Sequence, residues 1–300
     1  MLRLGIVDFD SSHCIEFTRR LNHVGIAPDQ YVDGARVVAG WPGTSEMAPQ
    51  RIPGFQEQMV AGDVPLVDDP ADLIGQVDAV LVLSLCGSAH LQRSQPFLEA
   101  GVPTYIDKPF ACSLQDALDI LQIAQAAGTT LAYGSALRFA EELTLLGRSL
   151  DRSGRILGML SCGPAKREAM NPGLFHYGIH TVEMLYSLMG TGCTQVVTAS
   201  SEDAEVVTGR WADGRLASIR GARSGATAYS VTVFCEQAVL HQPVSTRFAY
   251  RNLCREIVRS LSTRTPIVPY EEIEELTRFV LAALASAQAG GMPVALSEVT

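Results

Sequence analysis

The chain has 300 residues, of which 47% are hydrophobic and 18% charged, and its formal net charge at pH 7 is −9. This composition excludes a disordered or fibrous protein, and the acidic balance without a cluster of lysines and arginines excludes nucleic acid as the expected partner. Apolar runs too short to span a bilayer, a first strand that starts almost at Met1, and seven cysteines without C-x-x-C pairs predict a cytoplasmic protein with no signal peptide and no membrane segment.

Strands and helices alternate through the first half of the chain. The hydrophobic pattern predicts strands at residues 2–8, 35–40, 64–67, 78–84, 102–106 and 129–133, and helices at 12–24, 55–61, from 70 onward, 91–100 and 113–127. In the first of these helices, Ile15, Phe17, Leu21 and Val24 are expected to face inward. Such an alternation predicts a mostly parallel sheet with right-handed crossovers.

The second half changes character after residue 135. The pattern predicts helices at 136–150, 171–189, 246–262 and 270–289, and strands at 155–162, 195–200, 204–211, 216–220, 230–235 and 238–241. Asp213-Gly214 indicates a hairpin between two of these strands. We therefore expect an α/β protein with a Rossmann-like parallel-sheet domain at residues 1–135. A C-terminal α+β domain with a mixed or antiparallel sheet, at residues 136–300, follows as the substrate and oligomerisation domain.

The stretch Thr104-Tyr105-Ile106-Asp107-Lys108-Pro109-Phe110 lies between a strand and a helix. This position puts Lys108 at the carboxyl edge of the sheet, where open α/β sheets bind their ligands. Upstream, another buried strand opens onto the turn Ser84-Leu85-Cys86-Gly87-Ser88-Ala89-His90, and the helix after it stops at Gly101.

This order resembles the Gfo/Idh/MocA (glucose–fructose oxidoreductase/inositol dehydrogenase) family of NAD(P)-dependent sugar and polyol oxidoreductases. In that family a strand, a T-P-N-x-x-H-like turn, a helix ending in G-x-x-V and the triplet E-K-P follow one another; the triplet here is Asp107-Lys108-Pro109. The resemblance continues at 137–139 and 173–180. It implies NAD or NADP as cofactor, a small sugar-like or polyol-like substrate, and a homo-oligomer (dimer or tetramer) supported by the C-terminal sheet.

The nucleotide loop departs from the family pattern. Where relatives carry G-x-G-x-x-G/A, this chain reads Asp8-Phe9-Asp10-Ser11-Ser12-His13. A carboxylate about 5 Å from a phosphate costs roughly 3 kcal/mol at an effective dielectric constant near 20, and Asp8 and Asp10 would share a face if the strand continued. Ser11, Ser12 and the helix amides could still hold a phosphate if Asp10 turns away.

The second strand also lacks the acidic residue that usually holds the adenosine ribose. Trp41 either stacks on an adenine or is a core or interface aromatic, and Ser45 could meet a ribose or its phosphate. The residues predicted to bind the cofactor are Asp8, Phe9, Asp10, Ser11, Ser12, His13, Trp41, Ser84, His90, Asp107 and Lys108.

The resemblance also implies the catalytic residues. Lys108 would polarise the reacting hydroxyl and His180 would act as general acid and base, roles that suit an ammonium and an imidazole. The family's aspartate is replaced by His176, which we include in the catalytic set. We assign no metal site, although His176, His180 and Glu183 would line one helix face and H-x-x-x-H with a carboxylate is able to hold Zn²⁺ or Mn²⁺.

Arg138 either contacts an anionic substrate or pairs with Glu141 or Glu142. Two other functions stay open because a fold alone does not define an activity. One is a non-redox lyase or isomerase, with or without a metal, that has lost dinucleotide binding; the other is a non-catalytic sugar-binding protein.

Overall fold

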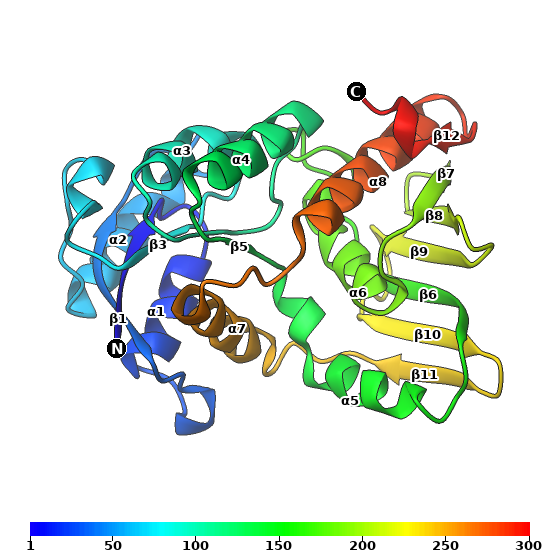
Figure 1. The fold of residues 1–300 in the computed structure, drawn as a ribbon, viewed down its shortest axis with the longest axis horizontal. Coiled ribbons are helices and arrows are strands. Elements are labelled where there is room, and N and C mark those ends of the chain that lie inside the picture. Colours follow the sequence, from blue (N-terminus) through cyan, green and yellow to red (C-terminus); the bar gives the residue numbers. More distant parts are fainter. The chain divides into compact units, whose positions relative to one another are not determined.

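The computed structural model describes residues 1–300, which form two compact units. Unit 1 comprises Met1–Ala111, Asp116–Gly134 and Tyr250–Tyr270, and unit 2 comprises Cys112–Gln115, Ser135–Ala249 and Glu271–Thr300 (Figure 1). The main division lies between Gly134 and Ser135, beside the predicted boundary. Residues 250–270 belong to unit 1, so the two units are not the contiguous ranges 1–135 and 136–300.

Unit 1 is built on a five-stranded parallel sheet in the order β2-β1-β3-β4-β5. The strands are β1 Leu2–Val7, β2 Ala35–Trp41, β3 Ala79–Val82, β4 Thr104–Ile106 and β5 Leu131–Tyr133. The helices are α1 His13–Asn22, α2 Ile52–Ala61, α3 His90–Glu99, α4 Leu114–Ala127 and α7 Ala249–Thr263. In Figure 1, α3 and α4 cover one face of this sheet and α1 and α7 the other. The predicted parallel Rossmann-like sheet is confirmed.

Three local predictions in unit 1 were wrong. Residues 64–67 form one bridge, Gly40 to Leu66, in place of a strand, because Pro65 has no N–H to donate to a ladder. The helix expected from residue 70 is the short 3₁₀ turn Pro70–Leu73. Val24 is 44% exposed, because α1 ends at Asn22 and His23 adopts a left-handed conformation with φ 58°.

Unit 2 contains a seven-stranded mixed sheet in the order β11-β10-β6-β9-β8-β7-β12. Its strands are β6 Ile156–Pro164, β7 Cys193–Ser200, β8 Ala204–Trp211, β9 Leu216–Ala222, β10 Ser230–Cys235, β11 Val239–Pro243 and β12 Val294–Ala295. The pair β6–β9 is parallel and the other pairs are antiparallel. The predicted hairpin at Asp213-Gly214 joins β8 and β9. Its helices are α5 Glu141–Leu150, α6 Ile179–Met189 and α8 Tyr270–Gln288.

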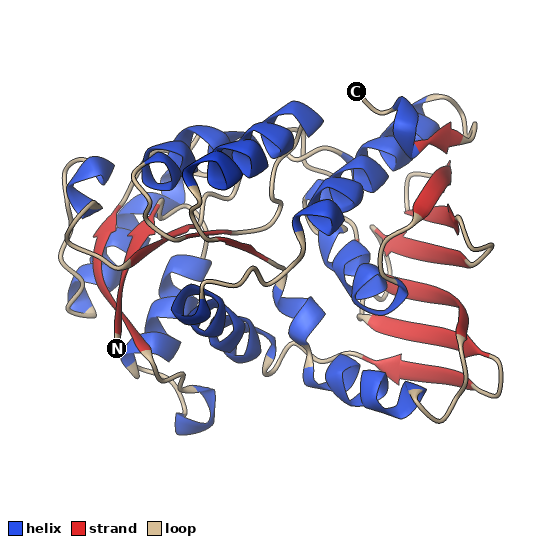
Figure 2. Ribbon diagram, in the orientation of Figure 1, coloured by secondary structure: helices blue, strands red, loops and turns tan.

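The two faces of this sheet differ in cover. α6 and α8 lie on one face (Figure 2), where Val207, Trp211 and Ile219 are at most 1% exposed. Strand register places five apolar residues on the opposite face, beside Arg210 and Arg220, and these five are 37% to 65% exposed: Val197, Val206, Leu216, Phe234 and Val239. Unit 2 therefore has one buried and one open sheet face.

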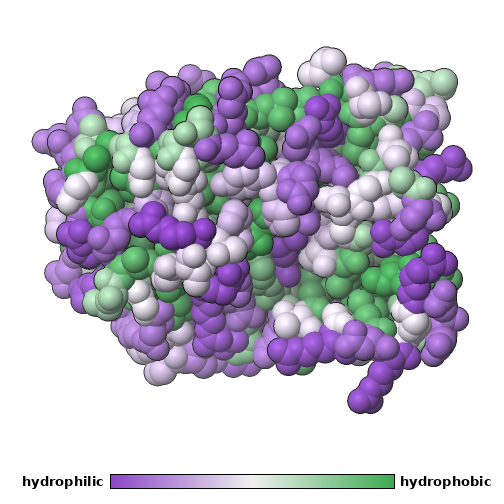
Figure 3. Space-filling view, viewed as in Figure 1, coloured by the Kyte–Doolittle hydropathy of each residue, from purple (hydrophilic) through white to green (hydrophobic).

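No helix is both long and apolar enough to cross a membrane. The face drawn in Figure 3 is a mosaic in which hydrophilic residues alternate with smaller hydrophobic areas.

Candidate functional site

The loop between β1 and α1 begins with a residue in left-handed conformation. Asp8 has φ 68° and stands where relatives have their first glycine. The backbone nevertheless continues to pair with the segment after β2, since the amides of Asp8 and Phe9 donate to the carbonyls of Trp41 and Pro42. The Phe9 ring fills the space over Gly40, where an added Cβ would lie 2.5 Å from it. The loop is thus closed by side chains that replace the missing glycines.

Both loop carboxylates are buried and accept hydrogen bonds from the protein. Asp8 Oδ2 accepts from Ser84 Oγ at 2.5 Å and from Arg93 Nε at 3.0 Å. Asp10 accepts from the Leu85 amide at 3.0 Å. Burial raises the pKa of Asp8 to about 6, against the lowering effect of Ser84 and Arg93. The strand does not continue through the loop, and the repulsion expected from two free carboxylates is offset by these donors.

Arg93 was not anticipated from the sequence. It lies in the first turn of α3, and its guanidinium is 4.8 Å from the centre of the Trp41 ring. Its Nη2 donates to Thr44 Oγ1 at 3.0 Å. The only indication in the sequence is its place three residues after His90, at the start of a helix that begins at the carboxyl edge of the sheet. Arg93 is the only arginine of α3, and it places a positive charge beside Trp41, the last residue of β2.

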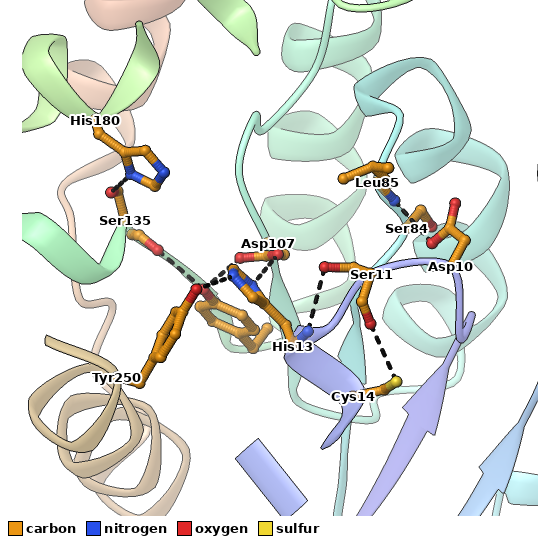
Figure 4. A network of polar contacts seen from close by, with 12 residues as sticks. Asp10, Ser11, His13, Cys14, Ser84, Leu85, Asp107, Ser135, His180 and Tyr250 are labelled. Atoms are coloured by element: carbon orange, nitrogen blue, oxygen red, sulfur yellow. Dashed lines mark hydrogen bonds and ion pairs between the residues drawn. The ribbon is translucent and has the colours of Figure 1, made fainter. Parts of the chain in front are cut away.

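His13 lies between two side chains that are distant in the sequence (Figure 4). Its Nδ1 is 2.6 Å from Asp107 Oδ2, and its Nε2 is 3.1 Å from the Tyr250 hydroxyl. Tyr105 donates to Asp107 Oδ1 at 3.2 Å. Burial alone would raise the pKa of Asp107, but His13 and Lys108 outweigh it and lower this pKa to about 2. Tyr250 was also missed, because nothing in residues 246–262 connects that helix with the nucleotide loop.

Lys108 follows Asp107 at the end of β4. Lys108 is 8% exposed. Its ammonium group makes no ion pair or hydrogen bond with the protein. Ammonium groups are rarely buried unless they are paired. The sheet edge therefore holds a cation on a largely buried residue, and the charge of this cation acts on the neighbouring Asp107 carboxylate.

His90 joins two parts of this edge. It is fully buried, with Nδ1 3.1 Å from the Phe110 carbonyl oxygen and Nε2 3.0 Å from the Ser84 carbonyl oxygen. Burial lowers the pKa of His90. The ring ties the Ser84 turn to the segment after Lys108. Its predicted contact with a cofactor stays a prediction.

In unit 2, His180 is held through one ring nitrogen. Its Nδ1 is 2.6 Å from the hydroxyl of the fully buried Ser135 (Figure 4). His176 does not share a helix face with it, as we had expected. A 3₁₀ turn at Gly173–Phe175 comes first, His176 has φ −75° and ψ −90°, and α6 begins only at Ile179. The ring of His176 stacks edge-on against Tyr177.

Arg138 pairs with neither Glu141 nor Glu142. It contacts Glu183 on α6 and Glu272 on α8, each at 2.5 Å. Both partners come from elements far from Arg138 in the sequence, so local spacing suggested the wrong acids. Glu183 therefore forms an ion pair with the Arg138 guanidinium. No group of three metal-ligating side chains is present.

A parallel sheet with helices on both faces, joined to a helix-covered mixed sheet, defines the class of two-domain nucleotide-fold proteins. Residues 48–135 match the Gfo/Idh/MocA family model, described as an oxidoreductase family with an NAD-binding Rossmann fold. The resemblance found in the sequence is thereby confirmed. The matched segment begins after the altered loop at residues 8–13.

Individual relatives agree with this family. A provisionally named oxidoreductase, YceM of Salmonella typhimurium, is 33% identical over 116 residues, which are 39% of this chain and 37% of that protein. The chain thus matches less than half of this relative's length. A protein described as a probable dehydrogenase of Thermotoga maritima has the same fold, with a TM-score of 0.84 at 19% identity over 100% of both chains.

Scyllo-inositol dehydrogenase of Lactobacillus casei, solved with NAD(H) and scyllo-inositol, superposes with a TM-score of 0.80 at 16% identity. This match covers 99% of this chain and 100% of that one. At such identities the two structural matches establish the fold.

The residues of unit 1 fit a dinucleotide. Asp10 turns away from α1, and the exposed Ser12 at the start of this helix makes no side-chain capping bond. The amide end of a helix attracts phosphate. Arg93 places a positive charge beside Asp8, which reduces the repulsion that the sequence predicts between the loop carboxylates and a phosphate. Ser12 at the start of α1 would hold the pyrophosphate, and Trp41 and Arg93 would lie on the adenosine side.

Proposed function

We propose that the protein is an NAD(P)-dependent oxidoreductase that transfers hydride to or from a sugar, a polyol or a related hydroxy-compound. The observation that carries the proposal is Lys108, a largely buried residue at the carboxyl edge of the parallel sheet whose ammonium makes no hydrogen bond with the protein. A cation in this setting stabilises the negative charge that develops on a carbinol oxygen during oxidation. The family match at residues 48–135 supports the redox assignment.

In the proposed reaction, His180 takes the hydroxyl proton, and Ser135 orients its ring through Nδ1. A histidine suits this task because its pKa lies near neutrality. Lys108 stabilises the resulting alkoxide. The bound dinucleotide supplies or accepts the hydride.

Dinucleotide titration and variant kinetics test the proposal. NADH or NADPH should bind in the micromolar range, seen as energy transfer from tryptophan or as heat. With a substrate found in a polyol and sugar panel, Lys108→Met and His180→Ala should each lower kcat by about 10²–10⁴-fold. Arg148→Met, which removes an exposed cation on α5, is the control and should be unchanged.

Failure of both dinucleotides to bind at millimolar concentration would contradict the oxidoreductase. Turnover of a sugar acid without added cofactor would then favour the lyase or isomerase. Binding of a sugar with no turnover, and no effect of Lys108→Met, would favour the non-catalytic protein.

A further inference from the structure

We propose that the adenosine end of this site selects the dinucleotide that carries a 2′-phosphate, NADP(H), and that Arg93 makes the selection. The inference rests on the proposed function and names its cofactor. In doubly wound folds an acidic residue near the end of the second strand binds the ribose hydroxyls of NAD, whereas an arginine nearby accommodates the 2′-phosphate of NADP.

The end of β2 carries no carboxylate. The last two residues of β2 and the four residues after it read Gly40-Trp41-Pro42-Gly43-Thr44-Ser45. An NAD-type ribose clamp therefore has no carboxylate acceptor in this segment. Its polar side chains are the hydroxyls of Thr44 and Ser45, and Ser45 Oγ already accepts a hydrogen bond from the Ala48 amide.

Arg93 supplies a cation to this position and is held in a fixed orientation. Nε donates to Asp8, Nη2 donates to Thr44, and the guanidinium lies over the Trp41 ring. The side chain is 16% exposed. Because the three contacts fix the plane of the group in advance, little side-chain entropy remains to be lost when it binds an anion.

One edge of the guanidinium is still available. No protein atom accepts a hydrogen bond from Nη1. A phosphate needs such N–H donors, and charge-assisted bonds to phosphate are stronger than bonds to a neutral ribose hydroxyl. The indole of Trp41 beside it offers a flat apolar face to an adenine.

Asp8 opposes this preference without cancelling it. Its carboxylate lies on the Nε side of the guanidinium, 3.0 Å from that nitrogen. A phosphate on Nη1 is closer to the positive charge than to the negative one, so attraction exceeds repulsion at any uniform dielectric constant. The net expectation is NADPH binding about tenfold or more tighter than NADH binding.

Cofactor titrations without substrate test this inference. The purified protein is titrated with NADPH and NADH, and in parallel with 2′,5′-ADP and 5′-AMP, which lack the nicotinamide. NADPH and 2′,5′-ADP should each bind at least about tenfold tighter than their partner compound. Arg93→Gln should abolish the difference by weakening NADPH while NADH changes less than about twofold. Arg19→Gln, on the same unit but paired with Glu16, should change neither.

Asp8→Asn provides an independent variant, since it keeps the arginine and removes the competing charge. It should strengthen NADPH binding relative to NADH, and Asp8→Asn/Arg93→Gln should lose the difference without leaving a buried acid unpaired. Equal or tighter binding of NADH by the wild type would overturn the 2′-phosphate inference and leave the oxidoreductase standing. Binding of neither dinucleotide would overturn both.

Discussion

At the scale of single residues, the altered nucleotide loop is compensated by charges from outside it. Asp8 stands opposite Arg93, and Asp107 opposite His13. Asp8 and His13 each replace a glycine of the family pattern, and each has acquired a partner on another element. The substitutions therefore form a connected set, in which two of the three lost glycines are exchanged for side chains with buried polar partners.

Replacing His13 should destabilise the fold through Asp107. His13→Gln removes the imidazole that lies 2.6 Å from the buried Asp107 carboxylate, which costs about 3–5 kcal/mol of the free energy of unfolding. Because the pKa of Asp107 is lowered to about 2, this contribution is present above about pH 4 and is lost as the pH falls toward 2. Urea unfolding at several pH values measures it, and the curves of variant and wild type should converge in acid.

Tyr250→Phe is the matched control for His13. It removes the hydroxyl bonded to His13 Nε2 but leaves the ion pair, so it should cost only about 1 kcal/mol. If both variants lose the same free energy of unfolding, the contact between His13 and the Asp107 carboxylate is not the source of the stabilisation.

Asp8 should make stability fall as the pH rises. The pKa of this carboxyl is raised from 3.8 to about 6 in the folded protein, so its proton is bound more tightly there than in the unfolded chain. The stabilisation is complete below about pH 4 and disappears as the pH rises through 6, a change of about 2–3 kcal/mol. Asp8→Asn should flatten the melting temperature across this range, and asparagine tolerates the positive φ. A wild-type curve with no slope between pH 4 and 7 would contradict the buried acid.

At the scale of elements, hydrophobic periodicity predicted the helices and strands whose positions depend on the burial of apolar side chains. The parallel strands, α4, α7, α8 and β8–β10 were located to within a few residues, because buried apolar residues recur at the strand or helix period. The sequence misled where one residue overrides the pattern. Pro65 prevents a strand, and the Gly173–Phe175 turn separates His176 from α6.

The candidate site was predictable only in its local parts. Lys108, the turn from Ser84 to His90 and the loop from Asp8 follow strand ends, which a sequence reveals. Arg93 and Tyr250 reach the same region from helices, and their contacts depend on side-chain direction in three dimensions. The Asp8–Arg93 pair spans 85 residues of sequence, a distance at which no spacing rule applies.

Arg138 should be critical for joining elements within unit 2. The guanidinium connects the turn Ala136–Phe139 with α6 and α8 through Glu183 and Glu272. Arg138→Met leaves two acids near each other in a buried setting and should cost about 3–5 kcal/mol. Arg148→Met, exposed on α5, should cost less than about 0.5 kcal/mol. Chemical denaturation measures both, and similar midpoints for the two variants would rule out the clamp.

At the scale of the whole molecule, we propose a homo-oligomer formed through the open sheet face of unit 2. The exposed row that includes Val206, Phe234 and Val239 is the apolar surface available for it. Phe234→Lys with Val206→Lys should convert the oligomer to a smaller species, seen by light scattering after gel filtration, because lysines on a buried interface are costly. A monomeric wild type at micromolar concentration would refute the assembly; Arg19→Gln serves again as the unaffected variant.

Because residues 250–270 belong to unit 1, this unit is completed late in the synthesis of the chain. The N-terminal sheet receives α7, with Tyr250 against His13, only after the chain of unit 2 up to Ala249 has been made. Ribosomes add about 5–20 residues per second, so roughly ten seconds separate the last sheet strand from the helix that completes its cover. The nascent nucleotide fold must wait in an unfinished form during that interval, and the dinucleotide loop acquires its full set of contacts among the last steps of synthesis.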